Sequence, residues 1–278
     1  MKKTAIAAVP LIAILMIVIF SGCAKKLDNK LEYEIMDDGT AEIVSYTDLT
    51  TATEIVIPDE IDGRPVVKVR DFGLFNAESL TKITIGKNIS EIGSWAFTNN
   101  QNLSEFSVNP ENQFFTAVDG VLFTKDMKTL VSYPPGRNIA FDKYKTALNT
   151  TSYQIPDGVA TIRSKAFYKC YYVTDIKIPE SVTTIEEKAF HRTSGLESIV
   201  LPQNLTFIGK DAFSYCGKLE RITIPASVRE IDEYAFYNCT NIKEVRMDGR
   251  EDGMTLGKKW YPTDNGRELK GMTIQWNN

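Results

Sequence analysis

"IPESVTTIEEKAF" runs from Ile178 to Phe190, and "IPASVREIDEYAF" runs from Ile224 to Phe236, with "LPQNLTFIGKDAF" from Leu201 to Phe213 between them. Each stretch begins 23 residues after the one before it. This interval is too short for repeats built from helix pairs, which need about 33 to 45 residues, but it lies within the 20 to 29 residues of leucine-rich repeats. The sequence therefore predicts a coil in which every repeat forms one turn.

The period extends well beyond these three stretches. The residues that follow successive apolar-x-apolar triplets form one column: Pro58, Gly86, Asn109, Pro134, Pro156, Pro179, Pro202, Pro225 and Asp248. Their spacing of 22 to 28 residues predicts one continuous solenoid of about nine turns over residues 57–249. The Ala-Phe pair is missing over residues 110–155, where "VDGVLFTKDMKTLVSY", residues 118–133, is typical of a hairpin inserted in irregular turns.

Each turn combines a strand with a second apolar pair. Ile222-x-Ile224 alternates with a period of two, which indicates a short half-buried strand, and the proline that follows cannot donate to a strand ladder. Val228 and Ile231 then lead into "DEYAF", for which we predict a short helical turn. The four repeat phenylalanines are expected to stack as an inward ladder, because a single turn cannot bury them alone: Phe167, Phe190, Phe213 and Phe236.

The turn from Cys216 to Cys239 reads C-x-x-L-x-x-I-x-I-P-x-S-V-x-x-I-x-x-x-A-F-x-x-C. This pattern resembles the BspA-like leucine-rich repeat family of bacterial surface proteins, and the resemblance covers roughly residues 31–249. It implies an α/β-type repeat solenoid with short parallel strands on its concave face. It also implies surface display, adhesion and binding of host or neighbouring-cell macromolecules.

The N-terminus has the form of an export signal, because Met1-Lys2-Lys3 precedes an apolar run from Ala5 to Phe20. These sixteen residues are short for a membrane-spanning helix, which needs roughly 20. The run ends in Phe20-Ser21-Gly22-Cys23, which resembles the lipobox of bacterial lipoproteins except that Phe20 stands where leucine is usual. The resemblance implies a signal peptide at residues 1–22 and lipidation of Cys23 in the cell envelope, and an uncleaved membrane anchor is the alternative.

The two ends of the coil are expected to be covered. Residues 23–30 are assigned to a lipidated tether, and residues 31–56 to a cap whose hairpin turns at Asp37-Asp38-Gly39. "MTLGKKWYPTDNGRELKGMTIQW", residues 254–276, breaks the period, so residues 250–278 are assigned to a C-terminal cap. Both caps are needed because an uncovered strand edge invites aggregation.

Residues that carry chemistry are scarce. Cys170, Cys216 and Cys239 share the position three residues after the repeat phenylalanine, and we interpret them as buried small residues rather than as metal or redox ligands. A disulfide between the stacked neighbours Cys216 and Cys239 stays open. The only histidine, His191, occupies the column of Tyr168, Ser214 and Tyr237 and is interpreted as a solvated turn residue. We therefore predict no catalytic, cofactor or metal site.

The outward positions of the strands form the predicted binding surface. Residues on either side of the apolar positions must point away from the core, and they form two columns: Asp175, Ser198, Arg221 and Glu244, and Lys177, Val200, Thr223 and Arg246. Lys177, Arg221 and Arg246, flanked by Asp175 and Glu244, are the candidates for binding carboxylated or sulfated glycans. A merely solvated face is the alternative.

The expected protein is thus a monomer that binds a protein or glycan ligand and reaches the membrane through lipidated Cys23. The formal net charge of −4 argues against nucleic-acid binding, which requires a concentrated basic surface. A structural or assembly role in the envelope is the alternative function. A glycan-acting enzyme is a lesser one, because no pair of opposed carboxylates is apparent.

Overall fold

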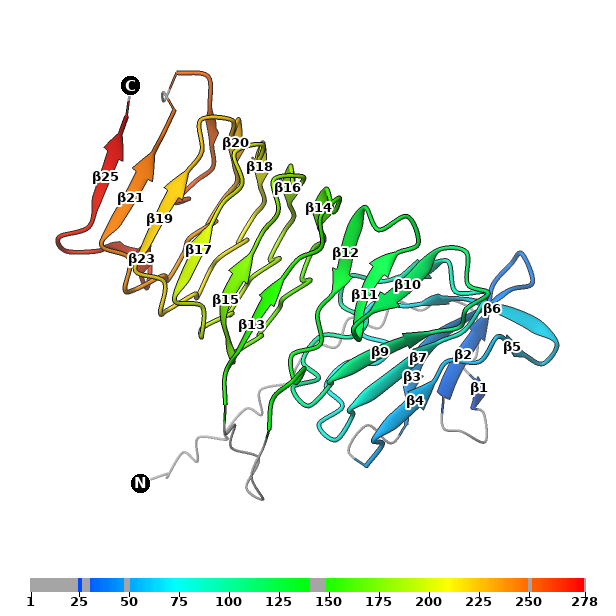
Figure 1. The fold of residues 1–278 in the computed structure, drawn as a ribbon. Coiled ribbons are helices and arrows are strands. Elements are labelled where there is room, and N and C mark those ends of the chain that lie inside the picture. The colour runs from blue at the N-terminus through cyan, green and yellow to red at the C-terminus, as the bar shows by residue number, and fades with distance from the viewer. Residues whose placement is uncertain (1–24, 27–30, 48–50, 141–148, 250–251, 278) are drawn as a thin grey trace, which may run out of the picture.

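The computed structural model describes residues 25–26, 31–47, 51–140, 149–249 and 252–277. The predicted signal peptide and Cys23 lie outside these ranges. Among the described residues, no helix is long and apolar enough to cross a membrane. The predicted solenoid of about nine turns of about 23 residues is confirmed, and Figure 1 shows successive turns side by side along the C-terminal half.

Every turn of the C-terminal half carries two strands, whereas the sequence pattern predicts only one. The first strands form two parallel three-stranded sheets: β13 (Thr151–Gln154), β15 (Val173–Lys177) and β17 (Ser198–Val200), then β19 (Arg221–Ile224), β21 (Glu244–Met247) and β25 (Thr273–Trp276). The second strands are two residues long and pair in parallel from turn to turn: β14 (Thr161–Ile162), β16 (Thr184–Ile185), β18 (Phe207–Ile208), β20 (Glu230–Ile231) and β22 (Thr255–Leu256). The second apolar residue of each repeat, Ile185 or Ile231, therefore lies in a strand of its own.

The N-terminal half has the same two layers. One sheet contains β4 (Glu54–Val56), β7 (Lys82–Ile85) and β9 (Glu105–Val108). The other contains β1 (Lys25–Lys26), β2 (Leu31–Ile35), β3 (Ala41–Tyr46), β6 (Arg64–Val69), β5 (Glu60–Ile61) and β8 (Glu91–Ile92). An antiparallel hairpin of β2 and β3 stands where the sequence predicts one, and β1, from the expected tether, pairs with β2. A small hairpin of β23 (Thr263–Asp264) and β24 (Arg267–Glu268) lies near the C-terminus.

A three-stranded antiparallel meander joins the halves: β10 (Phe115–Val118), β11 (Val121–Thr124) and β12 (Thr129–Ser132). Both of its faces are buried. Val121 and Phe123 pack into the C-terminal core, whereas Leu122 between them packs into the N-terminal core. Because alternate residues of a strand point to opposite faces, the meander is a wall shared by two hydrophobic cores. The continuous solenoid predicted from the sequence therefore contains two hydrophobic cores, which meet at the meander.

The predicted phenylalanine ladder is confirmed. Phe167, Phe190, Phe213 and Phe236 are all fully buried. Their successive ring centroids lie 5.0, 4.9 and 5.2 Å apart, with interplanar angles of 14°, 7° and 3°. The rings stack because each turn repeats the geometry of the one before.

The predicted helical turns are wrong, since the structure assigns no helix to the described residues. In the C-terminal half, the residue before each Ala-Phe pair has a positive φ, which is 64° at Lys165 and 57° at Lys188, and a right-handed helix cannot continue through it. Alternate backbone N–H groups also donate to carbonyls of the next turn rather than of their own: the Phe167 N–H donates to the Ala189 carbonyl at 2.7 Å. Pairing with the next turn therefore replaces the hydrogen bonds of a helix.

The cysteine column is buried, as predicted, and its thiols are free. Thr193, Cys216 and Cys239 each donate to the phenylalanine carbonyl of the preceding turn, whereas Cys170 Sγ lies 4.0 Å from the Tyr133 carbonyl oxygen. The Cys216 Sγ donates to Phe190 O at 3.2 Å, and the Cys239 Sγ donates to Phe213 O at 3.0 Å. Thr193, which replaces cysteine in one turn, donates through Oγ1 to Phe167 O at 2.8 Å. The position thus requires a small buried side chain that can donate a hydrogen bond, which explains why both cysteine and threonine occur there.

Candidate functional site

The two outward columns lie on what we call the strand face, the outer surface of β15, β17, β19 and β21. The strand register aligns Asp175 with Ser198 and Lys177 with Val200, and it aligns Arg221 with Glu244 and Thr223 with Arg246. Lys177, Arg221 and Arg246 are exposed, whereas Asp175 and Glu244 are half-buried. All five predicted site residues therefore lie on one face, although Arg221 stands in a different column from the other two cations.

The three cations of the strand face differ in their partners. Arg246 Nε lies 3.1 Å from Asp248 Oδ1. Within the described residues, neither Lys177 nor Arg221 has a carboxylate at ion-pair distance. On the corresponding face of the N-terminal half, Lys82 Nζ lies 2.6 Å from Glu105 Oε1 on the adjacent strand. Uncompensated positive charge on the strand sheets therefore belongs to the C-terminal half.

Val200 is a feature of the strand face that sequence reasoning passed over. Its side chain is 79% exposed, the largest exposure of the large hydrophobic residues in the described chain. It is aligned with Lys177 on one side, and the next turn, which carries Arg221, follows on the other. The signal was present in the sequence, since valine is the one large aliphatic residue in columns that are otherwise polar in these four turns.

The turn edge, which comprises residues 165–169, 188–192, 211–215 and 234–238, carries a row of aromatic rings that continues onto Trp95 and Phe72 of the N-terminal half. Successive contacts join residues of both halves at centroid distances of 5.2 to 5.7 Å: Phe72 with Trp95, Trp95 with Tyr168, Tyr168 with His191, His191 with Tyr215, and Tyr215 with Tyr237. Three cations lie over these rings. Lys165 Nζ is 4.3 Å from the Trp95 centroid, Lys169 Nζ is 5.5 Å from that of Tyr168, and Arg192 Cζ is 5.0 Å from that of Tyr215.

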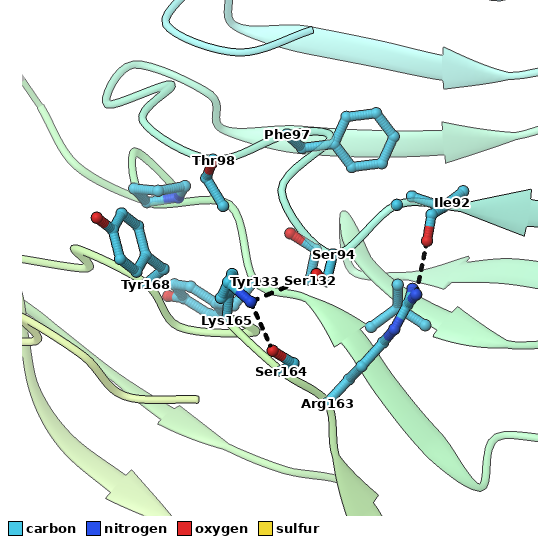
Figure 2. A pocket seen from close by; sticks show the side chains of 13 residues that line it. Ile92, Ser94, Phe97, Thr98, Ser132, Tyr133, Arg163, Ser164, Lys165 and Tyr168 are labelled. Atoms are coloured by element: carbon cyan, nitrogen blue, oxygen red, sulfur yellow. Dashed lines mark hydrogen bonds between the residues drawn. The ribbon is translucent and has the colours of Figure 1, made fainter. Parts of the chain in front are cut away.

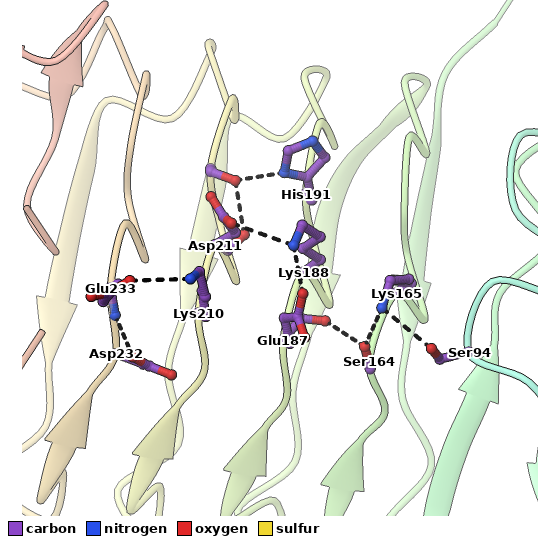
Figure 3. A network of polar contacts seen from close by, with 11 residues as sticks. Ser94, Ser164, Lys165, Glu187, Lys188, His191, Lys210, Asp211, Asp232 and Glu233 are labelled. Atoms are coloured by element: carbon purple, nitrogen blue, oxygen red, sulfur yellow. Dashed lines mark hydrogen bonds and ion pairs between the residues drawn. The ribbon is translucent and has the colours of Figure 1, made fainter. Parts of the chain in front are cut away.

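Ion pairs link the lower part of this edge from turn to turn (Figure 3). Lys188 Nζ contacts Glu187 and lies 3.5 Å from Asp211 Oδ2 in the next turn. Lys210 Nζ lies 3.1 Å from Glu233 Oε2 in the turn after that. Such half-exposed ion pairs contribute little to stability individually. Because the network joins residues of adjacent turns, we interpret it as positioning the turns rather than as a reactive site.

The interpretation of His191 as a solvated turn residue is wrong, because its side chain is 9% exposed. Its Nδ1 lies 2.6 Å from Ser214 Oγ, and that hydroxyl donates to the Asp211 carbonyl at 2.9 Å. Ser214 therefore accepts from His191, which places the proton on Nδ1. Burial, and then the nearby Arg192 and Lys188, lowers the pKa of His191 to about 4. The stacked neighbours on either side explain the burial, which a column of variable residues does not reveal.

The lowered pKa of His191 predicts a stability that rises with pH. Between about pH 4, the pKa of His191 in the folded chain, and its ordinary pKa of 6.5, the unfolded chain binds a proton that the folded chain does not. Stability is therefore lost as the pH falls through this window, by at most about 3 kcal/mol. Urea denaturation at pH 7 and pH 4.5 should show a larger loss for the wild type than for His191→Gln, which keeps a side-chain donor but does not titrate. Equal losses in the two proteins would contradict the buried neutral imidazole.

A small cavity lies where the N-terminal half meets the C-terminal half, and Figure 2 shows its lining. Arg163 Nη2 donates across the junction to the Ile92 carbonyl at 2.6 Å. Lys165 Nζ donates to Ser94 Oγ at 3.3 Å and to Ser164 Oγ at 2.9 Å. Burial lowers the pKa of both cations. Sequence reasoning missed this site, although arginine at position 163 stands out in a column that continues with Glu186, Gly209 and Asp232.

Metal-ligating residues do not gather elsewhere: in the part of the chain that the structure describes, no group of three His, Cys, Asp or Glu side chains is placed to hold a metal ion. The surfaces described above consist of exposed cations, aromatic rings and hydroxyls on a rigid repeat. Such an arrangement is suited to binding through many weak contacts.

The sequence matches the BspA type leucine rich repeat region in six copies, over residues 41–129 and 137–253. The interruption at residues 130–136 begins within the meander strand β12. The structure resembles that of the pneumococcal vaccine antigen PcpA, with a TM-score of 0.53 and 16% identity over 92% of this chain and 99% of that one. At this identity the likeness shows the fold alone.

Two further solved structures are similar. A leucine-rich repeat protein from Eubacterium ventriosum has a TM-score of 0.48 and 18% identity over 87% of this chain and 86% of its own. A leucine rich cell surface protein from Faecalibacterium prausnitzii has a TM-score of 0.47 and 20% identity over 85% of this chain and 98% of its own. No curated protein matches the chain.

Proposed function

Because the chain belongs to the BspA-type leucine-rich repeat family, we propose that it is a non-catalytic binding protein displayed outside the cytoplasm. Residues 1–22 direct export in this proposal, and lipidated Cys23 holds the protein in the bacterial cell envelope. The solenoid then presents the strand face to a macromolecule from a host or a neighbouring cell, and adhesion is the outcome.

The observation that carries the binding proposal is the composition of the strand face. Lys177 and Arg221 are exposed without ion-pair partners, and Val200 lies between their strands with 79% of its side chain exposed. Parallel strands hold these side chains at fixed spacing, so little ordering is needed when a ligand binds. Lysine and arginine bind carboxylate and sulfate groups through charge-assisted hydrogen bonds. The ligand class that fits is a glycan carrying such groups.

A panel of immobilised glycans tests this proposal. A soluble protein comprising residues 24–278 should bind sulfated or carboxylated glycans saturably, and the affinity should fall as salt concentration rises. Matched neutral glycans should bind far more weakly. Equal binding to neutral and acidic glycans, or hydrolysis of any of them, would contradict the proposal. Capture of a component from the cell's own envelope, without glycan binding, would support the structural alternative instead.

The anchor is tested separately through Cys23, which lies outside the described residues. Cys23→Ala should abolish incorporation of a labelled fatty acid and leave the protein unprocessed or released, because the thiol is the acceptor of the lipid. Ser21→Ala is the matched control, since it keeps a small residue before the cysteine and should retain the label. Labelling of Cys23→Ala at the wild-type level would exclude the lipoprotein assignment.

A further inference from the structure

The cavity at the junction of the two halves is built from three parts of the chain (Figure 2). The N-terminal half contributes Ile92, Ser94 and Thr98, the meander contributes Ser132, and the turn after β14 contributes Arg163 and Lys165. Residues that line it are thus up to 76 positions apart in sequence, from Ile92 to Tyr168, and Lys165 contacts Ser94 across 71 positions. A ligand held here would contact both halves of the solenoid.

The polar lining consists of cations and hydroxyl groups. None of the described residues that line the cavity is an aspartate or a glutamate. Lys165 has three N–H donors, and two of them donate to serine hydroxyls. In the described part of the chain, the third has only the Trp95 ring, 4.3 Å from Nζ, as a neighbour and can be donated to a ligand. Because Ser94 Oγ accepts from Lys165, its own hydrogen is free to be donated. Arg163 uses one N–H for Ile92 and keeps others.

The two cations lack the partners that their neighbours have. Lys188, one repeat further on, pairs with Asp211 in the following turn. The residue in the following turn next to Lys165 is Lys188 itself. Burial is the main cause that lowers the pKa of Lys165; Glu187 raises this pKa, and Lys188, a like charge, lowers it. Within the described ranges no carboxylate lies at ion-pair distance from Lys165, which is 6% exposed. Glu187 and Asp71 act on Lys165 only from beyond ion-pair distance. A buried cation that is paired with no carboxylate is costly, and an anion in the cavity would offset part of this cost.

We propose that the junction cavity binds an oxyanion, a single sulfate or carboxylate group, between Lys165 and Arg163 with the Ser94 hydroxyl as a neutral donor. The cavity volume of about 20 Å³ holds one water-sized group, so one or two oxygens of the anion enter it. The cavity is open to solvent, so the remainder of the ligand lies outside it. The bound anion stabilises the docking of the two halves, because a ligand that binds only the folded state shifts the folding equilibrium.

Thermal unfolding of the purified full-length protein in sodium sulfate tests this site, with ionic strength held constant by sodium chloride. The melting temperature should rise saturably with sulfate, by about 5 °C at a hundredfold excess over the dissociation constant. Lys165→Met should lose this rise, yet without sulfate it should melt no lower than the wild type, because the unpaired buried charge is gone. Lys218→Met removes an exposed lysine and one positive charge elsewhere, so it should keep the full response.

Ser94→Ala keeps the test decisive if Lys165→Met does not fold, because it removes one neutral donor and should weaken sulfate binding several-fold. The contrary result is a melting temperature that rises linearly with sulfate, and equally in the wild type and in Ser94→Ala or Lys165→Met. Such a rise is a general salt effect, and it would overturn the proposal. A sulfated heparin oligosaccharide used as the second probe distinguishes the sources of the anion. If the rise in melting temperature saturates at a lower concentration of the oligosaccharide than of sulfate, the site is assigned to a glycan. If it saturates only with sulfate, the site is assigned to a free ion.

The junction site is independent of the strand face. Charge reversal of the strand-face cations should leave the sulfate response intact, because none of them lines the cavity. Loss of the response in that variant as well would show that sulfate binds by general surface charge, and would overturn the proposal.

Discussion

Phe213→Ala is expected to lower the free energy of unfolding by about 3–5 kcal/mol. The ring is fully buried and lies 4.9 Å from Phe190 and 5.2 Å from Phe236, measured between centroids. The stacked turns cannot collapse into the vacated space without breaking their own pairing, so the cavity persists. Urea denaturation followed by circular dichroism measures the loss.

Tyr237→Ala is the matched control for this change, because it removes an aromatic ring from the half-buried turn edge of the next repeat. It should cost less than half as much. Equal losses would show that the inward face of the repeat has been misassigned. Hydrogen exchange adds a second readout: Phe213→Ala should reduce protection in β15 to β21 more than in β2 to β7, because the two halves have separate cores.

Simultaneous reversal of Lys177, Arg221 and Arg246 to glutamate should weaken binding of an acidic glycan by about 100-fold or more. The three side chains are exposed, so their replacement empties no core position and the melting temperature should change by only about 2 °C. Surface plasmon resonance on the glycan identified by the panel provides the measurement.

A second triple variant locates the interface if the first prediction is wrong. Tyr168, His191 and Tyr237 all contribute to the aromatic row of the turn edge. If binding survives the charge reversal and is lost when these three are replaced by alanine, recognition belongs to the turn edge. Retention of binding by both variants would exclude both surfaces.

The repeat itself was readable from sequence because its interactions are local and periodic. Each phenylalanine of the ladder contacts the phenylalanine one turn away, so residues 23 positions apart in the sequence have ring centroids about 5 Å apart. The same logic placed the cysteine column inside and directed Lys177 and Arg246 outward. The expected helical turn failed because local propensity was weighed without the next turn, whose carbonyls accept the Phe167 and Lys169 N–H groups.

The sequence alone determined the period, the inward ladder, the outward columns and the family. Only the tertiary structure decided what happens where the period is interrupted. The alternation of Val121, Leu122 and Phe123 is compatible with any half-buried strand, and it became a wall between two cores because both faces are covered. The junction cavity depends likewise on pairs such as Arg163 and Ile92, 71 residues apart. These residues stand at the ends of the second strands, β8 and β14, of two turns that are not consecutive in the sequence, so their proximity is set by how the two halves dock and not by the 23-residue period.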